Sequence, residues 1–348
     1  MKAIVHDRYG APDVLRTQEI DKPEIGPKDV LVRVHAASVH VGDWILMTGH
    51  PYVMRLGTGL RKPKNPVPGT DIAGTVEAIG PSVKGLRPGD EVFGWCAGGF
   101  AEYASGPADQ FVTKPGKLSF EQASAVGVSA STALQLLRDD GRVHAGQKVL
   151  INGASGGVGT FAVQIAKAFG AEVTGVASTR NLDLLRSIGA DHVVDYTRED
   201  FRTGSERYDV ILDNVGDHSM ASTRRALAPN GTLISNGGGH SSDKLGRVIR
   251  SALVSMFVRQ QARPSVKTQN RADLVALKDL AEASKVAPVI GGTYPLSQTA
   301  EAIAHVAAGH ARGTVVIGVI GPSNPHIASI PDAARSSREI STPVAAGS

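Results

Sequence analysis

Cysteine is almost absent from this chain of 348 residues, in which Cys96 is the single example. One cysteine cannot form a disulfide bond within the chain, and it excludes a zinc lobe built from several thiolates. Aromatic residues make up only 5% of the sequence and are not interleaved with basic residues. The pattern of a nucleic-acid-binding surface is therefore missing.

Long apolar runs and a dominant charge are missing as well. No stretch reaches the length of a membrane-spanning helix, and residues 1–8 lack the apolar core of a signal peptide. The 37 Lys and Arg nearly balance the 33 Asp and Glu, and the formal net charge is +4. We therefore expect a cytoplasmic protein with a small-molecule substrate, no nucleic-acid partner and no membrane span.

Glycine is plentiful, and its most informative cluster lies between an apolar strand at 149–151 and an apolar helix that follows at once. This order is typical of a βαβ unit that receives the pyrophosphate of a dinucleotide at the helix N-terminus. Ala154 stands where the first glycine of the motif is usual. The predicted cofactor contacts are Ala154, Ser155, Gly156, Gly157, Val158 and Gly159. The alternative is a glycine-rich turn that binds no ligand.

The next predicted strand, residues 172–177, ends in Ser178-Thr179-Arg180-Asn181. An NAD-selective protein would carry Asp or Glu near this point to hold the ribose 2′-hydroxyl. The hydroxyl of Ser178 and the guanidinium of Arg180 instead suit a 2′-phosphate, so NADPH is the expected cofactor. The alternative is that these residues only begin the helix over 182–188, which Asn181 could cap.

The remaining pattern divides the chain into segments. Residues 1–124 contain short strands between Gly and Pro turns, and Ser119 with Gln122 has the spacing of a capping box. Strands then alternate with helices, which predicts a doubly wound parallel sheet with strands at 149–152, 173–177, 192–194, 210–213 and 232–235. Beyond residue 265 we expect helices over 273–285 and 299–309 and strands over 288–296 and 314–319. Residues 321–348 lack apolar periodicity and are expected to be disordered.

These passages together resemble the medium-chain dehydrogenase/reductase superfamily, most of all its zinc-free quinone oxidoreductase branch, which is zeta-crystallin-like and reticulon-4-interacting-protein-like. The resemblance is carried by residues 152–170, 119–134 and 69–76. It implies an α/β fold in which a GroES-like, β-rich catalytic domain (1–124) is interrupted by a Rossmann NADPH-binding domain (125–264) and completed by a return segment (265–320). It also implies hydride transfer from NADPH in the cleft between the domains, in a homodimer.

The same resemblance indicates whether this chain carries the ligands of a catalytic zinc ion. The positions that hold the catalytic metal in zinc-dependent relatives correspond to His40, Thr70 and Val128. Only His40 could bind a metal, and a catalytic site needs three protein ligands. We therefore expect no metal. Without a Lewis acid, the acceptors that fit best are quinones and α,β-unsaturated carbonyl compounds, which need little polarisation.

Catalytic help is expected from the first domain. Tyr52 lies near the position where enoyl reductases of the superfamily carry a proton-donating tyrosine, His40 could donate a hydrogen bond to a carbonyl oxygen, and Asp43 would orient their loop. The alternatives are a tyrosine packed on a loop with its hydroxyl in water, and a structural histidine. By resemblance, Tyr196 would contact the 2′-phosphate of the cofactor. Further contacts implied by the resemblance are Asn214, Val215, Gly237 and Gly238, although Asn214 and Gly238 could equally be turn residues without a ligand.

The leading interpretation is thus an NADPH-dependent, zinc-independent reductase of quinones or enones. The alternatives are an enoyl thioester reductase and, from another class, an NADPH-binding regulatory or structural protein with little turnover. Two further segments stand out. The basic loop 55–64 could attract an anionic acceptor, although a solvated loop is the simpler interpretation. Residues 244–263 could form an amphipathic helix at a substrate entrance, a subunit contact or a membrane surface, and burial against the protein is the simplest interpretation.

Overall fold

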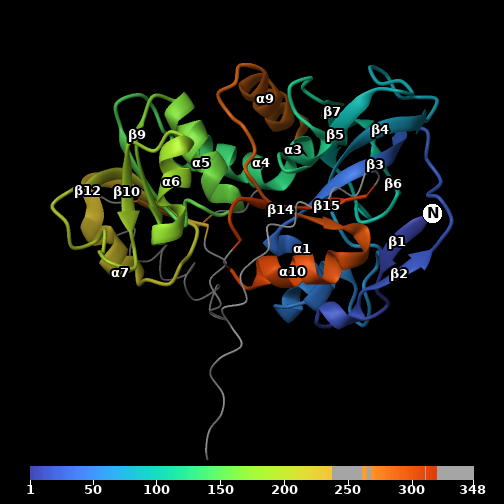
Figure 1. Ribbon diagram of the computed structural model, residues 1–348, viewed down its shortest axis with the longest axis horizontal. Coiled ribbons are helices and arrows are strands. Elements are labelled where there is room, and N and C mark those ends of the chain that lie inside the picture. Colours follow the sequence, from blue (N-terminus) through green and yellow to red (C-terminus); the bar gives the residue numbers. More distant parts are fainter. Residues whose placement is uncertain (237–260, 265–267, 310, 320–348) are drawn as a thin grey trace, which may run out of the picture.

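The computed structural model describes residues 1–236, 261–264, 268–309 and 311–319 (Figure 1). Two β-sheets lie side by side, with helices packed between and around them. Several sequence predictions fall outside the described residues: Gly237 and Gly238, the tail over 321–348, and most of the segment 244–263.

The first sheet contains strands from both ends of the chain. Its seven strands have the order β14-β15-β3-β4-β5-β7, and β6 pairs with β3. Because β15 pairs antiparallel with β3, with Val315 opposite Val39, the end of the described chain completes the sheet of the first segment. A small sheet of β1 (Lys2–Val5) and β2 (Arg16–Glu19) lies beside it. The strands are β3 (Asp29–Val39), β4 (Asp71–Ile79), β5 (Glu91–Trp95), β6 (Tyr103–Pro107), β7 (Phe111–Thr113), β14 (Ile290–Pro295) and β15 (Thr314–Gly318).

The second sheet has six parallel strands in the order β10-β9-β8-β11-β12-β13. They are β8 (Lys148–Asn152), β9 (Glu172–Ala177), β10 (His192–Asp195), β11 (Tyr208–Asp213), β12 (Leu227–Ser235) and β13 (Gln261–Pro264). The central strand β8 is buried on both faces, as its run of apolar residues predicts. The predicted parallel, doubly wound sheet is confirmed, but the helix expected to reach residue 263 is wrong at its end, because residues 261–264 pair with β12 as a strand.

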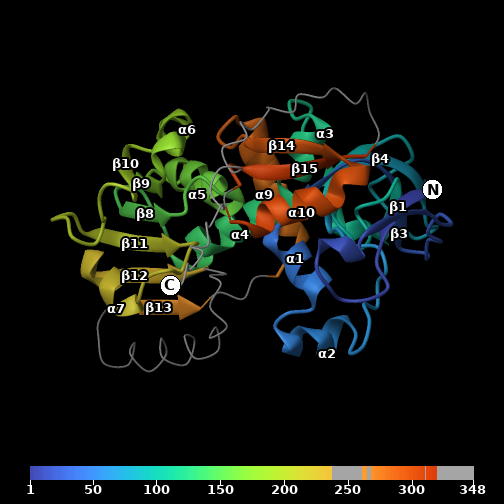
Figure 2. The same cartoon turned by 60° about the horizontal axis from the view of Figure 1, so that its bottom comes forward.

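Helices join the two sheets into one body. Ser119 accepts a hydrogen bond from the Gln122 backbone at 3.2 Å, and this capping box starts α3 as predicted. In Figures 1 and 2, α3 and α4 run between the sheets. One continuous apolar core reaches from Phe93 of the first sheet to Ile151 of the second. The helices are α1 (Val41–Thr48), α2 (Arg55–Thr58), α3 (Phe120–Ser124), α4 (Gly127–Gln135), α5 (Gly157–Ala168), α6 (Leu182–Ser187), α7 (Met220–Thr223), α9 (Arg271–Glu282) and α10 (Thr299–Ala307).

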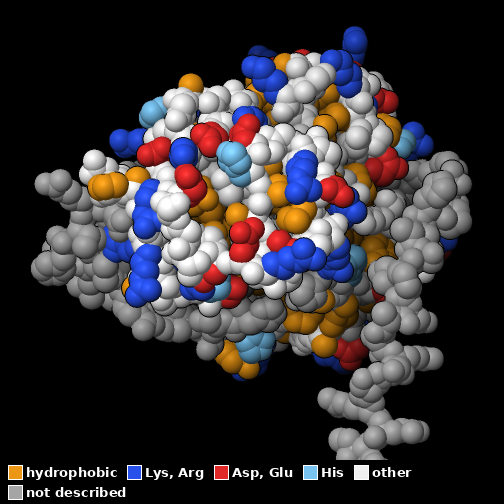
Figure 3. All heavy atoms as spheres, turned by 60° about the vertical axis from the view of Figure 1, so that its left-hand side comes forward, with side chains coloured by type: hydrophobic (Ala, Val, Ile, Leu, Met, Phe, Trp, Pro, Cys, Tyr) orange, Lys and Arg blue, Asp and Glu red, His pale blue; other side chains and the backbone are white. Residues whose placement is uncertain are grey.

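The surface carries both signs of charge. Over the face shown in Figure 3, Lys and Arg side chains are interspersed with Asp and Glu, and no large field of one sign covers it. Within the described residues, no helix combines the length and the apolar character needed to cross a membrane.

Candidate functional site

The glycine turn lies between β8 and α5. Gly153 adopts φ +72°, in the left-handed region that favours glycine, whereas Ala154 is buried and donates its N–H to the carbonyl of Val176 at 3.0 Å. The tight turn is therefore made by Gly153, one residue before the position expected for the first glycine. Sequence reasoning missed this residue, although the pair Asn152-Gly153 is a common turn signal.

Two other glycines in the turn have different reasons to be glycine. A Cβ on Gly159 would lie 2.2 Å from the carbonyl oxygen of Gly153, so the helix can pack this closely only without a side chain. A Cβ on Gly156 would meet nothing nearer than 3.6 Å. The protein itself therefore leaves open the space beside Gly156, directly before the first turn of α5.

The start of α5 suits an anion. Gly156 is extended, with φ −81° and ψ 177°, and the helix carries no acidic residue in its first turn. The N–H groups of that turn have no acceptors within the helix, and the helix dipole adds positive potential there. Ser155 is fixed from the other sheet, because its carbonyl accepts a hydrogen bond from the Gly313 N–H at 2.7 Å. Of the six predicted contacts, residues 155–158 are partly exposed and form a cradle at the helix start, whereas Ala154 and Gly159 are buried behind it.

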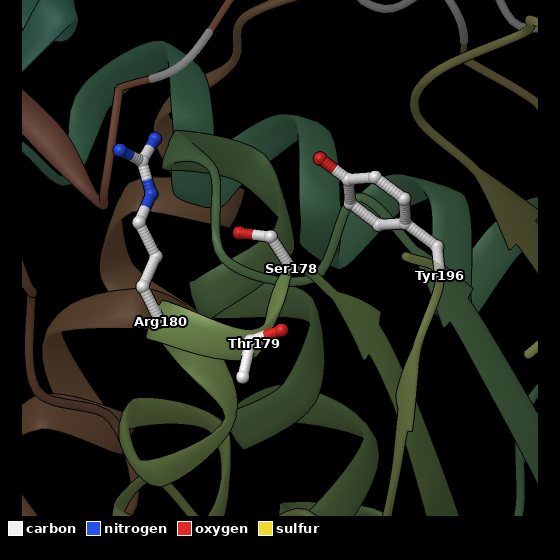
Figure 4. A pocket seen from close by; sticks show the side chains of 4 residues that line it. All are labelled: Ser178, Thr179, Arg180 and Tyr196. Atoms are coloured by element: carbon white, nitrogen blue, oxygen red, sulfur yellow. The ribbon is translucent and has the colours of Figure 1, made fainter. Parts of the chain in front are cut away.

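A hollow of about 470 Å³ lies beside this cradle, at the ends of β9 and β10. Its lining residues are Ser178, Thr179, Arg180 and Tyr196. Figure 4 shows that Ser178, Arg180 and Tyr196 extend to the same side, with Ser178 between the other two. The structure therefore brings together the three residues predicted for the 2′-phosphate, from two different strands.

Asn181 does not have the capping role considered as an alternative. Its side chain makes no cap hydrogen bond to α6. Instead, its amide nitrogen donates to the hydroxyl of Ser155 at 3.1 Å and to that of Ser178 at 3.4 Å. Asn181 is buried and links the glycine turn to the hollow. The simple capping interpretation is wrong, because the backbone of Asn181 is already helical, with φ −109° and ψ −2°, and continues the 3-10 turn over Thr179–Asn181 into α6.

An acidic side chain that sequence reasoning missed lies beneath the hollow. Asp195 accepts hydrogen bonds from the Thr179 hydroxyl at 2.5 Å and from the Thr197 hydroxyl at 2.7 Å. These hydrogen bonds, that of Thr179 first, lower the pKa of Asp195 below its usual value. The Asp195 carboxylate thus accepts hydrogen bonds from side chains of the protein itself. Thr179 lines the hollow while its own hydroxyl is turned to Asp195.

The loop after β11 lies at the edge of the sheet that carries the glycine turn. Asn214 donates to the carbonyl of Asn152 at 3.2 Å and accepts from Asn236 at 2.8 Å. Val215 is partly exposed, and a Cβ on Gly153 would lie 2.9 Å from its side chain. Asn214 and Val215 therefore lie against the glycine turn, as expected when the carboxyl ends of parallel strands meet at one edge.

In the first domain, His40 lies at the start of α1. Its ring Nε2 is 2.7 Å from the hydroxyl of Thr70, and its backbone N–H donates to the carboxylate of Asp43 at 2.9 Å. Asp43 is fully buried, and burial raises its pKa above the usual value. Asp43 thus orients the loop of His40, and the second ring nitrogen of His40 lies 3.6 Å from it.

The three positions that correspond to zinc ligands do converge. His40 meets Thr70, and the backbone N–H of Val128 donates to Asp71 at 2.7 Å. Asp71, which sequence reasoning missed, is fully buried, and burial raises its pKa to about 6. Gly127 leaves room for it, because a Cβ there would lie 2.4 Å from the Asp71 carboxylate. Among the described residues, no group of three or more His, Cys, Asp or Glu is arranged to hold a metal ion.

Tyr52 follows α1, in a short 3-10 turn. Its side chain is 65% exposed, and its ring contacts His50 at 4.3 Å between centroids and the Arg55 guanidinium at 4.7 Å. Its contacts are thus within its own loop and do not include His40, which pairs with Thr70. A proton-donating role for Tyr52 stays a prediction.

Comparison with known proteins agrees with this geometry. Residues 26–116 match the family model described as alcohol dehydrogenase GroES-like domain, and residues 188–317 match the one described as zinc-binding dehydrogenase. The chain is 33% identical to the mouse (Mus musculus) mitochondrial NAD(P)H oxidoreductase RTN4IP1, over 92% of this chain and 89% of that protein. It is 33% identical to the human quinone oxidoreductase, over 87% of this chain and 92% of that protein. It is 32% identical to the 2-methylene-furan-3-one reductase of Solanum lycopersicum, over 91% of this chain and 79% of that protein.

Solved structures give the same result. The quinone oxidoreductase from Coxiella burnetii matches with a TM-score of 0.80 and 31% identity, over 92% of this chain and 99% of that one. The Escherichia coli quinone oxidoreductase complexed with NADPH, at 23% identity and a TM-score of 0.77 over 92% of this chain and all of that one, shares the fold. The resemblance seen in the sequence is confirmed: this chain belongs to the medium-chain dehydrogenase/reductase superfamily, in its quinone oxidoreductase branch.

Proposed function

We propose that this protein is an NADPH-dependent, zinc-independent reductase that transfers hydride to quinones or α,β-unsaturated carbonyl compounds. The observation that carries the proposal is the hollow lined by Ser178, Arg180 and Tyr196, next to an open helix N-terminus. Three relatives support the reaction class, since their names are NAD(P)H oxidoreductase, quinone oxidoreductase and 2-methylene-furan-3-one reductase.

The residues present fit this cofactor. The open space beside Gly156 and the start of α5 would hold the pyrophosphate, and Ser178, Arg180 and Tyr196 would hold the 2′-phosphate through charge-assisted hydrogen bonds. Asn214 and Val215 would lie along the nicotinamide half. When bound, the nicotinamide supplies the hydride. With Ser178 in place of Asp or Glu, the chain has no carboxylate there to hold the 2′-hydroxyl of NADH.

The first domain would act through hydrogen bonds rather than a cation. His40 is held by Thr70 and Asp43, so its ring is oriented before any acceptor binds. We propose that His40 polarises the acceptor oxygen, that Asp43 positions it, and that Tyr52 is a second candidate donor. Because the zinc-ligand positions carry Thr70 and Val128, a metal would find a single imidazole among them. The acceptor must therefore be electrophilic by itself, as quinones and enones are.

Following NADPH absorbance with an ortho-quinone and, separately, an enone as acceptor tests the function. We expect NADPH to be oxidised with either acceptor, NADH to be much poorer, and prolonged chelation to leave the activity unchanged. A strong preference for NADH would contradict the assignment of Ser178 and Arg180. Stoichiometric zinc, with activity lost on chelation, would overturn the metal-free mechanism.

Two further outcomes separate the alternatives. Tight NADPH binding without oxidation by any acceptor would favour a regulatory or structural protein. Preference for enoyl thioesters over quinones, together with loss of activity in Tyr52→Phe, would favour an enoyl thioester reductase. A homodimer in the cytoplasm is also part of the proposal, and sedimentation equilibrium together with localisation of the tagged full chain tests it.

A further inference from the structure

A small part of the surface collects most of the exposed apolar side chains. We call residues 52–64 the tip; it includes α2 and projects below α1 in Figure 2. Of the nine large hydrophobic side chains that are exposed in the described chain, five lie in the tip, and Leu56 (72%) and Leu60 (69%) are the most exposed of all. The five are Tyr52, Val53, Met54, Leu56 and Leu60. Contiguous apolar exposure of this kind marks an interaction surface.

The tip is held in shape from within the protein. The Arg55 guanidinium donates to the carbonyls of Gly49 at 3.1 Å and Thr48 at 3.3 Å, at the end of α1, and stacks on the rings of Tyr9 and Tyr52. The Tyr9 hydroxyl donates to the carbonyl of Gly59 at 2.7 Å. The loop that carries the aliphatic side chains is therefore tied to the first domain, which holds them in an outward position; they are Val53, Met54, Leu56 and Leu60.

The charge of the tip has one sign. Between Asp43 and Asp71 the chain contains no Asp or Glu. Within this stretch Arg61, Lys62 and Lys64 are all exposed. A surface that presents apolar side chains beside basic ones matches the boundary of a bilayer, where apolar groups enter the acyl region and cations meet anionic headgroups.

We propose that the tip docks this protein on the surface of a bilayer that contains anionic lipids. A second copy is a poorer occupant, because a symmetric contact would place Arg61, Lys62 and Lys64 of two copies opposite one another. Docking does not depend on the proposed function. One consequence does depend on it. Helix α1, which His40 precedes, has eight residues and a length of about 12 Å, so a docked tip would bring His40 close to a phase that dissolves apolar quinones.

Co-sedimentation with vesicles tests the proposal. The full-length protein is mixed with vesicles of phosphatidylcholine alone or of phosphatidylcholine with phosphatidylglycerol, at low and high salt. We expect binding to the anionic vesicles, and weaker binding at high salt. Each basic side chain near an anionic surface contributes about fivefold, so R61Q/K62Q/K64Q should lower partitioning about a hundredfold. L56S/L60S should lower it at least about tenfold at unchanged charge.

Matched controls come from other exposed positions. K28Q/K84Q/K285Q removes the same charge elsewhere, and V275S removes an exposed apolar side chain from α9. Both should bind the anionic vesicles like the unaltered protein. Thermal melting of every variant checks that the fold is retained.

Three results would overturn the proposal. One is equal partitioning onto the two kinds of vesicle, including no binding to either. Another is an equal loss of vesicle binding in the tip variants and the control variants. The third is dissociation of a dimer by L56S/L60S, which would assign the tip to a second copy. Oxidation of NADPH by a water-soluble ortho-quinone without vesicles is measured in parallel. If that activity is absent while vesicle binding persists, the proposed function fails and docking stands.

Discussion

At the scale of single residues, the proposed contact of Arg180 with the 2′-phosphate of NADPH gives a direct test. It lines the hollow with Ser178 and Tyr196, where a 2′-phosphate would be the ligand. We expect Arg180→Ala to raise KM for NADPH about tenfold to a hundredfold, because a charge-assisted hydrogen bond is lost, while kinetics with NADH change little.

Initial rates at varied NADPH and NADH concentrations measure this effect. Arg186→Ala is the matched control, since Arg186 pairs with Asp183 on the exposed side of α6 and should not affect either cofactor. Equal losses for NADPH and NADH in Arg180→Ala would contradict a 2′-phosphate contact.

Asp71 carries a second prediction at this scale. Burial first, and Asp43 second, raise its pKa from 3.8 to about 6, against the opposing effects of His40, the Val128 N–H and Ser38. The folded state therefore binds this proton more tightly than the unfolded state does. The contribution of Asp71 is most favourable below pH 3.8 and is lost as the pH rises to about 6. Above that value a roughly constant penalty, on the order of 3 kcal/mol, remains.

We expect Asp71→Asn to remove this penalty and to flatten the pH dependence of stability across that window, provided that the new amide oxygen still accepts from Val128. Urea denaturation at a series of pH values gives the free energy of unfolding. Asp183→Asn, at a side chain that is 97% exposed, is the control and should leave the slope unchanged. An unchanged slope in Asp71→Asn would show that the carboxyl is not buried as described.

At the scale of elements, two glycines of the turn between β8 and α5 are expected to have different roles, Gly159 in stability and Gly156 in cofactor binding. A Cβ on Gly159 would lie 2.2 Å from the Gly153 carbonyl, whereas one on Gly156 would have 3.6 Å of space. We expect Gly159→Ala to destabilise the fold by about 1–3 kcal/mol or more, because α5 must move away from β8. Gly156→Ala should keep the melting temperature but weaken NADPH binding, because the methyl group would occupy the space left for the phosphates.

Thermal melting and NADPH titration of the two variants measure the two effects. They serve as controls for each other, since they add the same methyl group within one turn. If Gly156→Ala binds NADPH like the unaltered protein, the start of α5 is not the pyrophosphate site.

At the scale of the whole molecule, one short contact joins the two sheets at the site. The Gly313 N–H, just before β15, donates to the Ser155 carbonyl in the glycine turn. Gly313 has φ +68°, and a Cβ there would lie 2.4 Å from the carbonyl oxygen of Val289. The return of the chain to the first sheet thus also positions the cradle proposed for the cofactor.

We expect Gly313→Ala to lower both thermal stability and NADPH affinity. Gly309→Ala is the matched control, because Gly309 also has a positive φ, +76°, but open space around its Cβ. It should cost about 1 kcal/mol for backbone strain alone, and Gly313→Ala about 1–3 kcal/mol more. We call the hydrogen bond between Gly313 and Ser155 the clamp at Gly313. Differential scanning calorimetry and NADPH titration compare the two variants, and equal effects of the two substitutions would contradict a role of this clamp.

Local sequence was sufficient for much of this protein. Alternation of apolar strands and helices predicted the parallel sheet, and the residues Ser178 and Arg180 at the end of β9 were recognised because position after a strand determines which edge they reach. The capping box at Ser119 was predicted for a similar reason. In each case the determining contacts lie within a few residues or follow from the fixed geometry of a βαβ unit.

Other features depended on contacts between distant segments. Gly153 rather than Ala154 makes the turn, because Ala154 donates its N–H to Val176 at the end of β9. The side chain of Asn181 bonds to Ser155, which lies 26 residues away in the sequence. Strand β13 forms at 261–264 because it pairs with β12. Asp71 becomes a buried acid only when α4 covers it.

The sequence by itself thus determined the fold class and the half of the site that we propose for the cofactor, because periodicity and strand ends are local properties. Only the tertiary structure decided the surroundings of His40 and Asp71, the clamp at Gly313 and the outward tip. Burial, pKa shifts and exposed patches depend on which distant surfaces the folded chain brings together.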